Sequence, residues 1–99
     1  METKTTTHRE RVRTGVREYI YSNPELLPDE CWGVDDIETI IQTGIDILLT
    51  KWDLMHNASD FVNAICSNDL IGAVNRADFL HKQALIFYVM LFVNVGYIK

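Results

Sequence analysis

The sequence predicts an all-α protein, a compact array of about four helices at residues 7–22, 35–55, 59–66 and 69–95, with the last helix as its core. Apolar residues recur at three- and four-residue spacing in each range, which is typical of helices that bury one face. Turn-forming stretches such as Asn23-Pro24 separate the ranges. The chain has 99 residues, of which 47% are hydrophobic. We therefore expect one α-helical domain at 7–99, after a disordered tail at 1–6.

The first predicted helix, 7–22, has an N-terminal capping signal. Thr7 is a plausible N-cap, and Glu10 follows three residues later as in a capping box. Gly15 lowers the helix propensity, and such a glycine often marks the close approach of a neighbouring helix. The helix must end before Pro24, because a residue that precedes proline is disfavoured in helical conformation.

The second predicted helix, 35–55, has the most regular pattern in the chain. We expect it to begin at Asp35 or Asp36, whose carboxylates favour the positive end of a helix dipole. Its apolar face keeps helical spacing over five turns and comprises Ile37, Ile40, Ile41, Gly44, Ile45, Leu48, Leu49, Trp52 and Met55.

A short helix follows at 59–66, capped by Ser59 or Asn57. The stretch from Asp60 to Leu80 also has the order of a helix-turn-helix, with Asn68 suited to a left-handed turn. Few basic residues follow Asn68, which disfavours DNA recognition by this stretch.

The fourth predicted helix, 69–95, ends in an unbroken apolar run from Ala84 to Val93. These ten residues are too few for a bilayer span, which needs about 20, so we expect no membrane insertion. A strand at 84–95 is the alternative, but the chain offers no second strand to pair with it. A short chain cannot easily cover all sides of such a helix. We therefore predict a homodimer or higher oligomer, with its interface at Ile86, Phe87, Met90, Val93 and Tyr97.

Charge is distributed unevenly along the chain, whose net charge is −5. Residues 1–17 carry five basic and two acidic side chains, whereas residues 18–53 carry nine acidic side chains and one lysine. Guanidinium groups suit phosphate, so a nucleotide or nucleic acid is a possible ligand of Arg9, Arg11, Arg13 and Arg17. The alternative, which we favour, is that these arginines pair with acidic residues of the same chain or of a neighbouring subunit. An acidic surface for a basic partner is predicted at Glu25, Asp29, Glu30, Asp46 and Asp53.

Catalytic and metal-binding patterns find little support in the sequence. Cys31 and Cys66 lack paired spacing, and no glycine-rich phosphate loop or nucleophile elbow occurs. Asp53, His56 and Asp60 have helical spacing but straddle a predicted helix break. We therefore predict no enzyme activity, no metal and no cofactor.

The remaining function class is association with other macromolecules. The start of the sequence lacks a secretory signal, so we expect a cytoplasmic location. The leading hypothesis is a self-associating inhibitor, adaptor or regulator that binds another protein. Recognition of phosphate by the arginines is the alternative, with nucleic acid possible but not favoured, and a structural subunit of a larger assembly is a third possibility.

Overall fold

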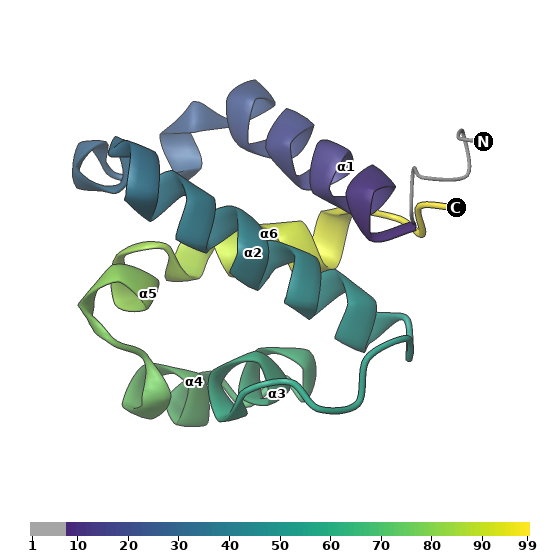
Figure 1. Cartoon of the computed structure of the whole chain (residues 1–99). Coiled ribbons are helices and arrows are strands. Elements are labelled where there is room, and N and C mark those ends of the chain that lie inside the picture. Colours follow the sequence, from purple (N-terminus) through teal and green to yellow (C-terminus); the bar gives the residue numbers. More distant parts are fainter. Residues whose placement is uncertain (1–7) are drawn as a thin grey trace.

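The computed structural model describes residues 8–99 and confirms the all-α class (Figure 1). No strand occurs in this range, and 84–95 is mostly helix rather than strand. Thr7 and the predicted tail at 1–6 lie outside the described residues. The α-helices are α1 (His8–Ser22), α2 (Val34–Lys51), α3 (Asp60–Cys66), α4 (Leu70–Arg76), α5 (Phe79–Gln83) and α6 (Leu85–Asn94), with 3₁₀ turns η2 (Pro24–Leu26) and η3 (Asp29–Trp32).

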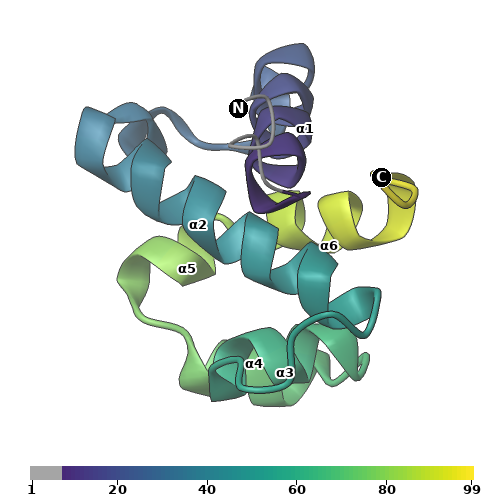
Figure 2. The same ribbon diagram turned by 45° about the vertical axis from the view of Figure 1, so that its right-hand side comes forward.

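The core is built around α2, not around the C-terminal helix as the sequence had predicted. Helix α2 contacts α1, α3, α6 and η3, and it runs through the middle of the molecule in both ribbon views (Figures 1 and 2). Its buried residues are Ile37, Ile40, Ile41, Gly44, Ile45, Ile47, Leu48 and Leu49. Helix α1 adds Val12, Val16 and Ile20 to the same cluster of buried side chains. The regular apolar pattern therefore marks the helix that contributes the most residues to the core.

Three helices meet at Gly44, near the middle of α2. A Cβ atom at this position would lie 3.0 Å from the Leu91 side chain of α6 and 3.1 Å from the Val16 side chain of α1. Both distances are shorter than most real Cβ contacts, so the missing side chain lets α1 and α6 approach α2 closely. The sequence had placed the close approach at Gly15 instead. At Gly15 a Cβ would meet Ile98 of the C-terminal segment, which is not helical.

The predicted helix at 69–95 is wrong in extent, because the chain forms three helices there. Ala77 and Asp78 are extended, with ψ of 138° and −177°, and they separate α4 from α5. The Asp78 carboxylate accepts a hydrogen bond of 2.9 Å from the His81 backbone N–H. An aspartate that caps a new helix in this way competes with continuation of the preceding one. Helices α5 and α6 are separated only by Ala84.

Aromatic contacts hold the short helix α5 against its neighbours. The His81 ring stacks on Phe61 of α3, with centroids 5.0 Å apart and planes at 11°. His81 Nδ1 also lies 2.9 Å from the hydroxyl oxygen of Tyr88 on α6. Tyr88 is fully buried, and burial raises the pKa of its phenol. Helix α5 is thereby joined to α3 and α6 through one side chain.

Several helix ends agree with the predicted signals, and those of α2 do not. Ser59 caps α3, Asp69 caps α4, and Asn68 has the expected positive φ of 60°. Helix α2 instead starts at Val34, after Gly33 and without a side-chain cap. It ends at Lys51 rather than at residue 55, because Asp53 adopts a left-handed conformation with φ of 64°.

The C-terminal segment 95–99 closes the structure by returning to the start of α1 (Figure 1). The backbone oxygen of Ile98 hydrogen-bonds the ring of His8, and that of Lys99 accepts a bond of 2.5 Å from Arg11 Nε. Lys51, the last residue of α2, donates to the backbone oxygen of Phe92 near the end of α6. A cation at this position satisfies carbonyl groups that the helix leaves unpaired.

We predict that Gly44→Leu destabilises the protein. Leucine is a good helix former, so the loss comes from overpacking against Val16 and Leu91, which costs about 1–3 kcal/mol. Urea unfolding measures the change in the free energy of unfolding. Gly96→Ala is the matched control, because a Cβ there meets no atom within 4 Å and its φ is not positive. Equal stability of Gly44→Leu and the wild type would contradict the close approach.

Candidate functional site

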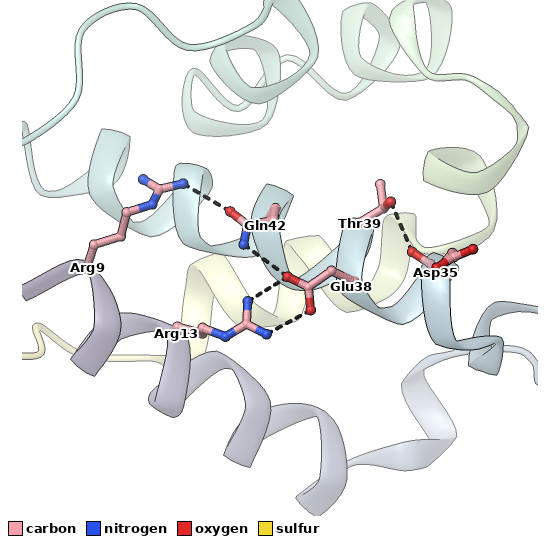
Figure 3. Close-up of polar contacts among 6 residues, drawn as sticks. All are labelled: Arg9, Arg13, Asp35, Glu38, Thr39 and Gln42. Carbon is pink, nitrogen blue, oxygen red and sulfur yellow. Dashed lines mark hydrogen bonds and ion pairs between the residues drawn. The ribbon is translucent and has the colours of Figure 1, made fainter.

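The predicted arginine surface is largely an internal contact between α1 and α2 (Figure 3). Arg13 makes two hydrogen bonds of 2.7 Å to the two carboxylate oxygens of Glu38. Arg9 donates to Asp46 at 3.0 Å and to the side-chain oxygen of Gln42 at 3.2 Å. The later arginine pairs with the earlier acid, so the two helices run antiparallel. Arg9 and Arg13 are four residues apart on α1, and their partners on α2, Glu38, Gln42 and Asp46, follow one another at four-residue spacing on one face.

Glu38 is the most strongly perturbed carboxylate of this surface. The hydrogen bonds from Arg13 lower the pKa of Glu38 to about 2, and a bond of 3.1 Å from Gln42 contributes in the same direction. The carboxylate stays ionised at neutral pH and keeps the planar Arg13 fork in place. Two of the four predicted phosphate ligands, Arg9 and Arg13, are thus already bound to acidic side chains.

The other two arginines contact different partners. Arg17 lies over the ring of Tyr21, 5.6 Å from its centroid, in a cation–π arrangement. Arg11 donates to the C-terminal backbone of Lys99. The structure does not bring the four guanidinium groups together around one common position. The favoured interpretation, in which these arginines pair within the chain, holds for Arg9 and Arg13.

The residues of the predicted acidic surface also differ in their partners. Asp46 is occupied by Arg9, and Asp53 lies 3.5 Å from His56. Glu25, Asp29 and Glu30 are exposed at the η2 and η3 turns, and they form no ion pair with any of residues 8–99. Within the predicted acidic surface, these three carboxylates therefore lie together in sequence, just before α2.

The residues of the predicted oligomer interface differ in exposure. Ile86 and Val93 are 62% and 64% exposed on α6, and Met90 between them is 37% exposed. Phe87 is fully buried against the core, so it cannot contact a partner without unfolding α6. Tyr97 lies beyond the helix, where its ring packs edge-on against Trp52 at 5.0 Å. Helix α6 thus has a buried face and an exposed apolar row, Ile86, Met90 and Val93.

An apolar pocket that the sequence did not indicate lies beside this row. It has a volume of about 160 Å³ and is lined by Ile65, Asn68, Asp69, Leu70, Val89, Phe92 and Val93. Leu70 at the start of α4 is itself exposed. The turn at Asn68 sets α4 against α3, and the break between α4 and α5 lets the chain return so that α6 lies near Leu70. A continuous helix at 69–95 would have kept Leu70 and Val93 far apart, which is why the sequence did not reveal the pocket.

Neither a metal site nor a reactive Cys66 thiol is indicated in the part of the chain that the structure describes. No three His, Cys, Asp or Glu side chains among residues 8–99 are placed to share a metal ion. Burial raises the pKa of the Cys66 thiol to about 11, which disfavours the reactive thiolate. None of the helices at 8–99 has the length and apolar character that a membrane span requires. The helix-turn-helix order exists at α3 and α4, but α4 ends at Arg76 after seven residues.

Comparisons with known proteins give no relative: no family model, no curated protein and no solved structure matches the chain.

We predict that the Arg13–Glu38 pair makes stability depend on acid pH. The pKa of Glu38 is depressed in the folded protein, so the stabilisation exists above its usual pKa of 4.5 and is lost as pH falls toward about 2. Urea unfolding of the wild type and Glu38→Gln should therefore differ most near neutral pH and converge in acid. Glu25→Gln is the control, because Glu25 has no ion-pair partner within residues 8–99. A stability difference for Glu38→Gln that does not change with pH would refute this prediction.

Proposed function

We propose that this protein acts by protein–protein association, as a self-associating regulator, inhibitor or adaptor. The observation that carries the proposal is the exposed apolar row of α6, beside the apolar pocket next to Leu70. Monomeric soluble proteins seldom expose large contiguous apolar patches, and such patches commonly mark interaction sites. In contrast, the arginine surface is engaged within the chain by Glu38 and Asp46.

A second copy of the chain is the occupant that we propose for the α6 row. Residues 84–98 contain no charged side chain. Two copies with a net charge of −5 each can therefore approach along α6 without placing like charges opposite one another. A two-fold pairing would set the row of one copy against the same row of the other. The pocket beside Val93 could then receive an apolar side chain from the partner copy.

Ile86→Glu tests the self-association. Sedimentation at micromolar concentration should show the wild type above its monomer mass of 11.4 kDa, and the variant at that mass. A charge placed in an apolar contact should raise the dissociation constant at least tenfold, or about 1.4 kcal/mol. The folding cost should be small, because Ile86 is exposed in the first turn of α6, where an acidic side chain suits the helix dipole.

Val34→Glu is the matched control for this test. Val34 is also an exposed apolar residue in the first turn of a helix, but it lies on α2. It receives the same change of charge and should keep the wild-type mass. A wild type that sediments as a monomer at every concentration, or equal dissociation of both variants, would show that α6 is not a self-association surface.

The proposal also concerns a further partner, which the protein would regulate by binding rather than modify by catalysis. The arginine alternative requires a phosphate ligand to displace Glu38 from Arg13 and Asp46 from Arg9. A structural subunit of a larger assembly would use the same α6 row but would bury it permanently. We favour the regulator because a separate groove lined by carboxylates lies at the other end of α2.

A further inference from the structure

A groove with acidic walls lies between η3, the first turn of α2 and α5, which occupy one end of the molecule in both ribbon views (Figures 1 and 2). Its volume is about 350 Å³, within the range of about 300–1,000 Å³ common for ligand pockets. Its lining includes Glu30, Cys31, Asp36, Asp78, Phe79 and Leu80. Each of the three elements therefore contributes one carboxylate to the groove, beside apolar surface.

The carboxylates of this groove have no cationic partner among residues 8–99. Glu30 and Asp36 take part in no ion pair there, and Asp78 accepts only the capping bond from the His81 N–H, which leaves one of its oxygens available. The sequence has no lysine or arginine between Arg17 and Lys51, and α5 adds only Lys82 and His81. The negative charge in the groove is thus left almost uncompensated.

A buried thiol in the wall of the groove also lacks a partner. The Cys31 side chain is 1% exposed, and it makes no hydrogen bond to any of the described residues. Burial raises the pKa of this thiol, and the charges of Asp36 and Glu30 raise it further. Cys31 lines the groove together with Glu30 and Asp36, so two negative charges lie in this part of the wall, where they favour a cationic ligand.

The exposed aromatic ring of Phe79 also determines which ligand suits the groove. Its ring is 75% exposed at the start of α5, beside the Asp78 carboxylate. An exposed aromatic face next to carboxylates suits a guanidinium group, which can stack on the ring while its N–H groups bond carboxylate oxygens. Lysine offers a compact charge without the planar surface, and phosphate would be repelled by the acidic walls.

We propose that this groove binds an arginine side chain of a partner protein. The proposal rests on the proposed role in association and names the chemistry of the further partner. The groove and the α6 row use different helices, so one chain can contact a second copy through α6 and a basic partner through η3, α2 and α5. The partner segment would carry an arginine beside apolar residues that cover Phe79 and Leu80.

The test is an NMR titration of the full ¹⁵N-labelled chain with the peptide acetyl-Leu-Arg-Leu-amide at low salt. Saturable shifts should appear in the amides of residues 29–37 and 78–84. The same peptide with citrulline in place of arginine keeps the shape and loses the charge, and it should not bind. Binding of both peptides with equal affinity, or no saturable shift at millimolar arginine peptide, would overturn the proposal.

Variants distinguish binding in the groove from attraction of the peptide by the overall negative charge of the protein. Asp36→Asn and, independently, Glu30→Gln should each weaken binding of the arginine peptide about three- to fivefold, as expected for a partly exposed charge pair. Asp35→Asn is the matched control, because Asp35 is the neighbouring exposed carboxylate and does not line the groove. Equal weakening by Asp35→Asn would show that only net charge attracts the peptide. A dispersed spectrum for each variant shows that it is folded.

The Ile86→Glu chain distinguishes this proposal from the self-association. If the groove acts independently of α6, this variant binds the arginine peptide with wild-type affinity. If the wild type proves monomeric but still binds the peptide, only the α6 proposal fails. If the wild type self-associates but does not distinguish the arginine and citrulline peptides, only the groove proposal fails.

Discussion

The close approach of three helices at Gly44 is the constraint on which the rest of the structure depends. Because Gly44 has no side chain, Val16 of α1 and Leu91 of α6 both reach the surface of α2. Helix α6 can then bury Phe87, Tyr88 and Leu91 against α2, and its opposite side faces outward. The exposed row of Ile86, Met90 and Val93 is thus a consequence of how α6 packs. Lys51, at the end of α2, holds the last turn of α6 in this position.

Charge also acts on the contact between α1 and α2. Arg9 and Arg13 contact Asp46, Gln42 and Glu38 in antiparallel order, which fixes how far α1 can slide along α2. Exposed ion pairs contribute little to stability, so their main effect here is on register. They also change the electrostatics of the surface. Once Glu38 and Asp46 are paired, carboxylates at the η2, η3 and α5 end remain without an ion pair among residues 8–99, including Glu25, Asp29, Glu30, Asp36 and Asp78.

The sequence predicts a helix well where only one face of the helix is apolar. It predicts poorly where a side chain can cap a new helix within a helical pattern, or where all faces of a helix are apolar. Helix α2 follows from its spacing, and Ser59 and Asn68 act as their residue types predict. Asp78 stands within a helical pattern, and only its capping bond to His81 shows that a new helix begins there. In the apolar run of α6, periodicity cannot distinguish buried Phe87 from exposed Ile86. The pairing of Arg13 with Glu38 depends on the orientation of α1, which spacing within either helix does not specify.

The two candidate surfaces differ in what they can discriminate. The α6 row is apolar and uncharged. Its burial makes the free energy of association more favourable, but it discriminates poorly among apolar partners. Pairing between two copies needs little discrimination among partners, because every copy of the chain carries the same row. The groove at η3 and α5 has the opposite character, since anionic and neutral ligands would leave its carboxylates unpaired and would therefore bind less well than a cation. Specificity for a further partner would therefore come from the groove. The α6 row would determine how many copies of the chain, and thus how many grooves, one assembly contains. A dimer with two such grooves would bind a partner that carries two arginine segments more tightly than either groove alone, provided that the spacing of the segments matches.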